Sequence, residues 1–394
     1  MGDVEQAAVT IRATSSIASI DATEWDACAG DTNPFLCHAF LKALEDSGSV
    51  RVETGWLPYH VVVEGVDGRI RGAAPLYVKS HSQGEYMFDY GWADAFERAG
   101  GQYYPKLQLA IPFTPVTGPR LLARNDRELV MNRELVLAGC VEVASQLEVS
   151  SLHITFLTEH EWKQCGESGL LKRTGEQFHW LNNGYATFDE FLSDLTSRKR
   201  KQIRRERREI QENTDLDIQV FTVEDLKEEH WDAFFGFYID TSNRKWGRPY
   251  LNRQFFSLIG ETMADRIALV LAMRNGNYIA GALNFIGSDA LYGRNWGCSE
   301  DHRFLHFEAC YYQAIQFAIE RGLERVEAGA QGTHKLARGY LPVHTYSVHW
   351  IREVKFREAI ERYLAHERQQ VDQDITYLST HSPFRDTDME DYGF

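Results

Sequence analysis

Residues 326–340, VEAGAQGTHKLARGY, combine the residue types that acid–base and oxyanion chemistry require. A predicted strand enters a loop with Gly332, whose missing side chain lets backbone N–H groups approach a ligand closely. Glu327 and His334 could act as general base or acid, and Lys335 could stabilise an oxyanion or a phosphate. The alternative interpretation is a structural loop with surface charges.

The segment SRKRKQIRRERR, residues 197–208, is strongly basic within an acidic chain. It holds eight basic residues and one acid, whereas the whole chain has a net charge of −15. Arginine forks bind phosphate oxygens two at a time, so Arg200, Lys201 and Arg204 are predicted to contact the phosphates of a donor. A solvated helix face is the alternative, because charge runs are usually exposed.

Aromatic and charged residues also gather beside glycines in three segments. Such sets suit a cleft that orients a polar substrate through a few fixed groups, although aromatic side chains can equally close a domain interface. The residues predicted to line a substrate cleft are Asp89, Trp92, Trp246, Arg294 and Trp296.

Composition excludes several classes of protein. A pI near 5.4 argues against duplex DNA as a partner. The six cysteines lack zinc spacing, so we expect free thiols and no metal site. The N-terminus lacks a secretory h-region and no apolar run reaches the roughly 20 residues that span a bilayer, which predicts a cytoplasmic protein.

The motifs G-x-S-x-G, Walker A, G-x-G-x-x-G and H-E-x-x-H are missing from the sequence. Their absence argues against the commonest hydrolases, NTPases, dehydrogenases and metalloproteases, and leaves group transfer.

A doubled pattern predicts the elements that position these residues. Two hairpins, at 59–79 and 268–292, have a glycine at the turn and another inside the second strand. We expect a third strand after each, at 84–96 and 290–297, and then a long helix and a further strand. The pattern predicts an α/β protein with partly antiparallel sheets and two domains, residues 1–185 and 186–394.

The motifs together resemble those of a bacterial FemAB-like family concerned with peptidoglycan biosynthesis or recognition, in the GNAT acyltransferase superfamily. The resemblance covers residues 12–385 and rests on residues 72–122 together with these segments: GALNFIG, LYGRNWG, RKWGRPYL, SRKRKQIRRERR and VEAGAQGTHKLARGY. It implies two tandem GNAT-like (acyl-CoA N-acyltransferase-like) domains with mixed α+β sheets. In Fem transferases a basic helix and a late Gly–Lys segment help to hold donor or acceptor, which implies this role for Ser197, residues 200–204 and residues 332–335.

The resemblance implies an N-acyltransferase or aminoacyltransferase. The donor would be acyl-coenzyme A or aminoacyl-tRNA, with no tightly bound cofactor, and the acceptor a small-molecule amine. Residues 298–309 lack the glycines of a pyrophosphate loop, and no heptad run corresponds to the coiled-coil arm of Fem enzymes. The alternative is therefore a non-catalytic protein that binds small molecules or cell-wall precursors on a GNAT scaffold.

Overall fold

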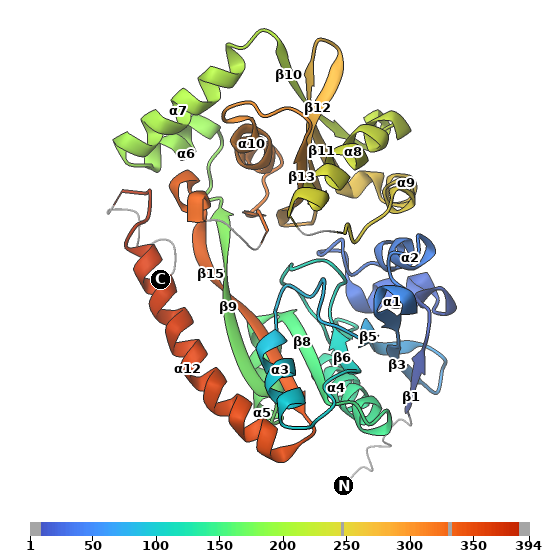
Figure 1. Ribbon diagram of the computed structural model, residues 1–394. Helices are drawn as coiled ribbons and strands as arrows, with labels where there is room; N and C mark the ends of the chain where they lie inside the picture. The colour runs from blue at the N-terminus through green and yellow to red at the C-terminus, as the bar shows by residue number, and fades with distance from the viewer. Residues whose placement is uncertain (1–8, 246–247, 330–332, 386–394) are drawn as a thin grey trace. The chain divides into compact units, whose positions relative to one another are not determined.

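The structure, a computed structural model, describes residues 9–245, 248–329 and 333–385 (Figure 1). The chain forms two compact units. Unit 1 comprises residues up to Gly175 together with Thr345–Val371, and unit 2 comprises Glu176–His344 and the chain from Asp372 onward. The compact units therefore differ from the predicted ranges, 1–185 and 186–394, because a late strand and helix return to unit 1.

Unit 1 contains two sheets. The first has the order β1-β3-β4-β7, and the second contains the neighbours β15-β8-β6-β5-β2. The strands are β1 (Val9–Thr14), β2 (Trp56–Pro58), β3 (His60–Gly65), β4 (Ile70–Ala74), β5 (Leu76–Lys79), β6 (Lys106–Leu109), β7 (Leu122–Ala123), β8 (Ser151–Leu157) and β15 (Leu341–Ile351), whose first residues belong to unit 2. The helices are α1 (Ala22–Ala29), α2 (His38–Asp46), α3 (Tyr90–Arg98), α4 (Leu129–Gln146), α5 (Glu159–Glu167) and α12 (Val354–Ser379), whose last residues belong to unit 2.

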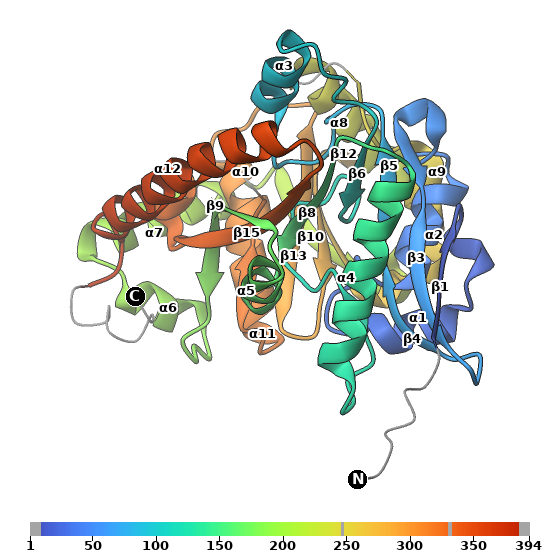
Figure 2. The same cartoon turned by 90° about the horizontal axis from the view of Figure 1, so that it is seen from below.

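The core of unit 1 lies between α4 and the strands that it covers (Figure 2). Val136 and Cys140 of α4 are fully buried there against Val61 of β3. A Cβ at Gly72 of β4 would lie 2.6 Å from a Val136 methyl. Gly72 therefore allows α4 to approach the sheet closely, which is the role that a glycine inside the second strand of the hairpin predicts.

Unit 2 is built on one sheet with the order β10-β11-β12-β13-β14-β9. The strands are β9 (Leu171–Leu181), whose first residues belong to unit 1, β10 (Leu216–Thr222), β11 (Ile267–Arg274), β12 (Asn277–Ile286), β13 (Ala290–Cys298) and β14 (Arg325–Glu327). The helices are α6 (Phe188–Asp194), α7 (Ser197–Gln211), α8 (Glu228–Lys245), α9 (Arg253–Thr262), α10 (Leu305–Phe307), a π-turn (Glu308–Tyr312), α11 (Gln313–Glu320) and a 3-10 helix (Thr333–Arg338).

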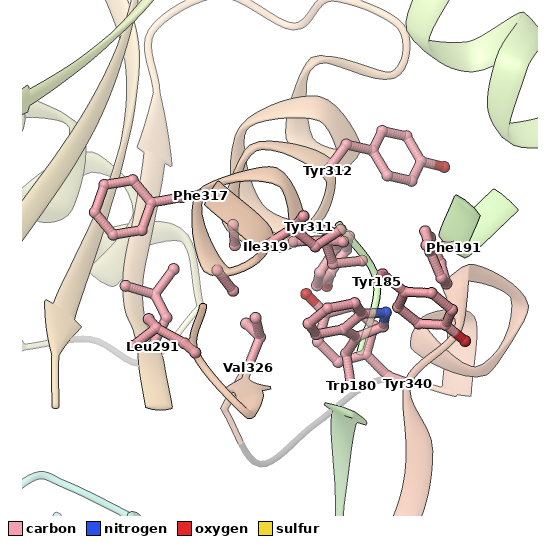
Figure 3. Close-up of a cluster of buried hydrophobic side chains, with 14 of the residues drawn as sticks. Trp180, Tyr185, Phe191, Leu291, Tyr311, Tyr312, Phe317, Ile319, Val326 and Tyr340 are labelled. Atoms are coloured by element: carbon pink, nitrogen blue, oxygen red, sulfur yellow. The ribbon is translucent and has the colours of Figure 1, made fainter. Parts of the chain in front are cut away.

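Aromatic side chains fill the core of unit 2 beneath α11 (Figure 3). Trp180 of β9, Phe191 of α6 and Tyr340 are fully buried in it. Val326 of β14 packs into the same cluster. The core therefore fixes β14, the strand that leads into the predicted catalytic loop.

The predicted repeat is present, but its first copy has a different third strand. The turn glycines Gly68 and Gly276 both have positive φ, as a hairpin turn requires. The prediction of a strand over 84–96 is wrong, because this segment enters helix α3. In the first copy β6 takes the place that β13 has in the second copy. β6 pairs in parallel with β8, and β13 pairs in parallel with β14, and in each copy a long helix lies between the two paired strands along the chain. The six cysteines form no disulfide bond with one another in the structure.

Candidate functional site

The two parallel strands at the centre of unit 2 separate after a short pairing. β13 and β14 pair over only three residues, from Ala290 and Arg325 to Tyr292 and Glu327. A register shift opposite Leu283 then bends β13. The separation leaves a cavity of about 90 Å³, and the side chains that face it include Arg294, Trp296, His306, Cys310 and Tyr311. Two residues predicted for a substrate cleft, Arg294 and Trp296, therefore lie together here.

Tyr311 and His334 form the polar pair beside this cavity. The Tyr311 hydroxyl lies 2.9 Å from His334 Nε2. Burial raises the pKa of Tyr311, so the phenol stays protonated at neutral pH. His334 is exposed, and Tyr311 stands on the π-turn, a feature that often marks functional sites. The pair can exchange a proton with a ligand in the cavity.

Lys335 is buried, although the sequence pattern alone could place it at the surface. Its side chain is about 1% exposed, and Nζ donates a hydrogen bond to the Gly329 carbonyl over 2.6 Å. Burial lowers the pKa of Lys335 to about 8. Lys335 thus fixes the loop that follows β14, and it retains most of its charge at neutral pH.

Glu327 points to the face of β14 opposite Val326, away from the core under α11. Its Oε1 accepts from Arg325 Nε over 3.0 Å, and its Oε2 has no hydrogen-bond partner among the described residues. A buried carboxylate oxygen without a partner is costly unless a ligand supplies a donor.

His179 is a neighbour of Glu327 that the sequence analysis missed. The two residues are register partners on β9 and β14, and His179 Nε2 lies 3.7 Å from Glu327 Oε2. Burial lowers the pKa of His179 although the Glu327 carboxylate opposes the shift, so the imidazole is neutral at neutral pH. Sequence offered no signal for this residue, because His179 becomes relevant only through strand pairing across roughly 150 residues.

One face of the basic helix α7 is structural. Glu206 is buried and binds Arg338 and the hydroxyl of Tyr312. Arg207 pairs with the buried Glu308 over 3.0 Å and stacks on Phe188. These contacts anchor α7 to the π-turn and to the 3-10 helix that carries His334 and Lys335.

The predicted phosphate contacts lie toward the outer side of α7. Arg200 donates to the Ser193 carbonyl, and Arg204 pairs with Asp189 over 2.9 Å, where both side chains are more than half exposed. Lys201 is exposed and forms no ion pair within the described part of the chain. Arg198, Arg205 and Arg208 extend this exposed basic stripe at helical spacing.

Asp89 and Trp92 lie in unit 1, at the start of α3. Both line a cavity of about 870 Å³ between α3 and the first turns of α12. The structure therefore places the predicted cleft residues in two different cavities, one in each unit. Trp246 and Gly332 lie outside the described residues.

Asp89 belongs to a buried network of charges. Lys106 Nζ lies 2.5 Å from Asp89 and 2.7 Å from Glu85, and Ser82 and Tyr103 also donate to Asp89. Burial alone would raise the pKa of Asp89, but Lys106 and these donors hold this pKa well below the usual range. Burial also raises the pKa of Glu85 to about 7 and lowers that of Lys79 to about 7.

In unit 1, the Arg120 side chain occupies the position that corresponds to the cavity of unit 2. β6 and β8 also pair over three residues, ending at Leu109 and Ile154. The fully buried Arg120 side chain donates to the next carbonyl, Thr155, and to that of Val116, over 2.9 and 2.6 Å. The site between separating parallel strands is therefore open in unit 2 and closed in unit 1.

No helix in the described chain is long and apolar enough to cross a bilayer. Within the described residues, no three His, Cys, Asp or Glu side chains cluster as metal ligands would.

Comparison with known proteins gives the family and the fold. No curated protein matches the sequence significantly. FemX is 12% identical with a TM-score of 0.55, covering 87% of this chain and 98% of FemX. The C-terminal domain of a putative lysylphosphatidylglycerol synthetase from Agrobacterium fabrum is 10% identical with a TM-score of 0.53, covering 88% and 96%. L-PGS from Bacillus licheniformis is 11% identical with a TM-score of 0.50, covering 85% and 98%.

These likenesses confirm the predicted fold class, an α/β protein with mixed sheets. The FemAB-like family model, described as peptidoglycan biosynthesis/recognition, matches residues 16–386. The match spans nearly the whole sequence, so the chain belongs to the FemAB-like family.

Proposed function

We propose that the protein transfers an acyl or aminoacyl group from a phosphate-bearing donor to an amine acceptor, with the chemistry in unit 2. The observation that carries the proposal is the separation of β13 from β14, which opens a cavity beside Tyr311 and His334. Membership of a family concerned with peptidoglycan suggests that the amine belongs to a cell-wall precursor.

In the proposed reaction, the acceptor nitrogen attacks the donor carbonyl and a C–N bond forms. The bond from the carbonyl carbon to the leaving oxygen or sulfur breaks. Glu327 is proposed to take the proton that the amine loses, which requires the acceptor to reach the face of β14 opposite the core under α11, where its Oε2 is buried and has no hydrogen-bond partner among the described residues. The Tyr311–His334 pair returns a proton to the leaving group, and the charge of Lys335 stabilises the oxyanion.

The donor is proposed to be acyl-coenzyme A or aminoacyl-tRNA. A donor that binds the native protein should raise its melting temperature, so the first experiment measures Tm with acetyl-coenzyme A, long-chain acyl-coenzyme A and aminoacyl-tRNA. A shift with one of them identifies the donor class. No shift with any of them would count against donor binding and hence against the proposal.

Replacing Lys201 and Arg204 together by alanine should weaken binding of aminoacyl-tRNA about tenfold if tRNA is the donor. The exposed stripe of α7 would contact phosphates, and each lost contact should reduce the slope of log K against log salt by roughly one. Binding is measured at several salt concentrations. Lys163→Ala is the control, because Lys163 is an exposed lysine of unit 1 that pairs with Glu159. An unchanged salt slope would remove α7 from the donor site.

The pH dependence of kcat should report Lys335. Its pKa is lowered to about 8, so the ammonium is lost as pH rises through about 8 and kcat should fall there. Lys335→Arg should abolish this alkaline limb, because arginine stays charged. A kcat that rises through pH 8 would instead assign Lys335 a role as a base. Circular dichroism of both proteins from pH 7 to 9 checks that the fold persists.

The alternative function, a non-catalytic binding protein, is favoured by the 870 Å³ cavity of unit 1, a volume typical of ligand sites. Trp92→Ala separates the two functions in cells. If cells with Trp92→Ala behave like cells that lack the protein, whereas cells with Glu327→Gln or Lys335→Ala behave like the wild type, the protein acts by binding.

A further inference from the structure

The cavity beside the separating strands of unit 2 is small. Its volume is about 90 Å³, whereas a water molecule takes about 30 Å³ in the liquid, so the space suits roughly three non-hydrogen atoms. An acetyl group has this size. The residues of the sheet that line the cavity include Ala282, Gly293 and Ala328, which have little or no side chain. The room for a ligand therefore depends on small residues at these three positions.

Three aromatic rings, which we call the ring wall, line the cavity on another side. The ring centroids of Trp296 and His306 are 5.3 Å apart, and those of His306 and Tyr311 are 5.4 Å apart. Trp296 also packs against a buried cluster that contains Ala282 and Ala309. Packed rings can move only by changing rotamer against their neighbours, so the ring wall limits how far a bound acyl chain extends.

Gly293 stands where β13 bends away from β14. It pairs with Asn284 of β12, immediately after the register shift. A Cβ at Gly293 would lie 3.4 Å from Asn284 Oδ1 and 3.5 Å from the Glu327 carbonyl oxygen, which is ordinary van der Waals contact. An alanine would therefore fit at this position, and its methyl group would occupy part of the space that the cavity offers.

The cavity holds no carboxylate that could balance a cationic ligand. Arg294 brings a positive charge to the lining, and no Asp or Glu of the described chain lines the cavity. Glu327 lies on the other face of β14, where it meets the acceptor amine in the proposed reaction. Burying an ammonium group near a guanidinium without a carboxylate is costly, whereas an uncharged acyl group has no such cost.

We propose that Gly293 and the ring wall restrict the transferred group to a short, uncharged acyl group of two or three carbons. This inference rests on the proposed function and narrows its donor to a thioester. The C–S bond of the thioester breaks and a C–N bond to the acceptor forms. The proton of the amine passes to Glu327, and the leaving thiolate takes a proton from the Tyr311–His334 pair.

Calorimetric titration of the full chain with coenzyme A and five of its thioesters tests both limits. The thioesters are acetyl-, propionyl-, butyryl-, octanoyl- and β-alanyl-coenzyme A. Acetyl- or propionyl-coenzyme A should bind at least about tenfold more tightly than octanoyl-coenzyme A, because methylenes beyond the limit of a pocket have penalties of this size. Butyryl and β-alanyl groups have equal length, so their comparison isolates charge, and the β-alanyl thioester should bind about tenfold more weakly.

Two substitutions change the cavity in opposite directions. Gly293→Ala should lower the affinity for propionyl-coenzyme A about tenfold and leave that for coenzyme A, which has no acyl group, unchanged. Gly236→Ala is the matched control, because this exposed glycine of α8 has open space beside it. Trp296→Leu keeps an apolar side chain but opens the ring wall, and should raise the affinity for octanoyl-coenzyme A about tenfold relative to acetyl-coenzyme A.

Three results would overturn the inference. The first is native protein that binds octanoyl- as tightly as acetyl-coenzyme A, or β-alanyl- as tightly as butyryl-coenzyme A. The second is an unchanged ratio of these affinities in both variants. The third is a Tm raised by aminoacyl-tRNA when no thioester binds, which would leave the proposed transfer standing. Failure of both donor classes to bind would contradict the proposed function as well.

Discussion

Replacing Glu327 by glutamine is expected to lower kcat by about 10²–10⁴-fold, the usual contribution of a general base. The amide keeps the shape of the side chain and can still accept from Arg325, but it cannot take the proton of the amine. Arg325 also retains its contact with Asp289 at 2.6 Å, so the sheet around β14 should persist. The measurement is transfer of a radiolabelled acyl or aminoacyl group under single-turnover conditions.

Glu324→Gln is the matched control, because Glu324 is an exposed carboxylate three residues earlier in the same segment. It should leave kcat within about twofold of the native value, since surface substitutions rarely have larger effects. Full activity of Glu327→Gln would contradict the assignment of the base. Activity lost together with a lowered Tm would indicate a structural role for Glu327 instead.

His179 gives this prediction a second readout. If His179 positions Glu327, His179→Gln should lower kcat while leaving KM and the fold unchanged. A change of KM with an unaltered kcat would place His179 in substrate binding.

The sequence could predict much of unit 2, because its strands are continuous and separated by clear turns. The turn at Asn275 and Gly276, the strands on each side of it and the helix that follows are all present. The strand Arg325–Glu327 and the 3-10 turn Thr333–Arg338 are also present, since both are local features. What the sequence could not predict is that Lys335 is buried, because burial depends on the cover provided by distant elements.

The first copy of the repeat was harder to predict for two physical reasons. Pro75 lies between β4 and β5, and the strands on its two sides belong to different sheets. The segment before β6 then contains a helix, α3, whose aromatic and glycine residues resemble a strand end. The sequence analysis predicts a strand over 84–96, whereas Asp89 at the start of α3 is held in a buried network by Lys106.

The basic helix α7 illustrates the limit of a charge pattern. The sequence places basic residues along most of the helix, but the structure shows that Arg207 forms an ion pair with the buried Glu308 of unit 2 and is therefore not available to a ligand. Only the outer stripe remains for a ligand. Partners separated by about 100 residues decide which arginines are structural, and no local pattern contains that information.

Lys106→Ala is expected to destabilise unit 1 by about 3–5 kcal/mol, because it leaves Asp89 buried without its cation and leaves Glu85 with only Lys79, at 3.8 Å. Lys106 is fully buried, and its attraction to both carboxylates outweighs the cost of burying it and raises its pKa. Unfolding in urea, followed by fluorescence, measures the loss. Lys163→Ala removes an exposed lysine from an i,i+4 pair and should cost no more than about 1 kcal/mol.

A triple variant separates the loss of an ion pair from the loss of packing. Lys106→Met with Glu85→Gln and Asp89→Asn removes the charges together while keeping the side-chain volumes similar, so it should be more stable than Lys106→Ala alone. The amide that replaces the Asp89 carboxylate can still accept a hydrogen bond from Ser82 or Tyr103. If the triple variant is less stable than the single one, then the network stabilises unit 1 through hydrogen-bond geometry that neutral groups cannot reproduce. If Lys106→Ala costs less than 1 kcal/mol, Asp89 and Glu85 must be neutral or hydrated in the native protein, and the anchoring of α3 through an ionised Asp89 would be wrong.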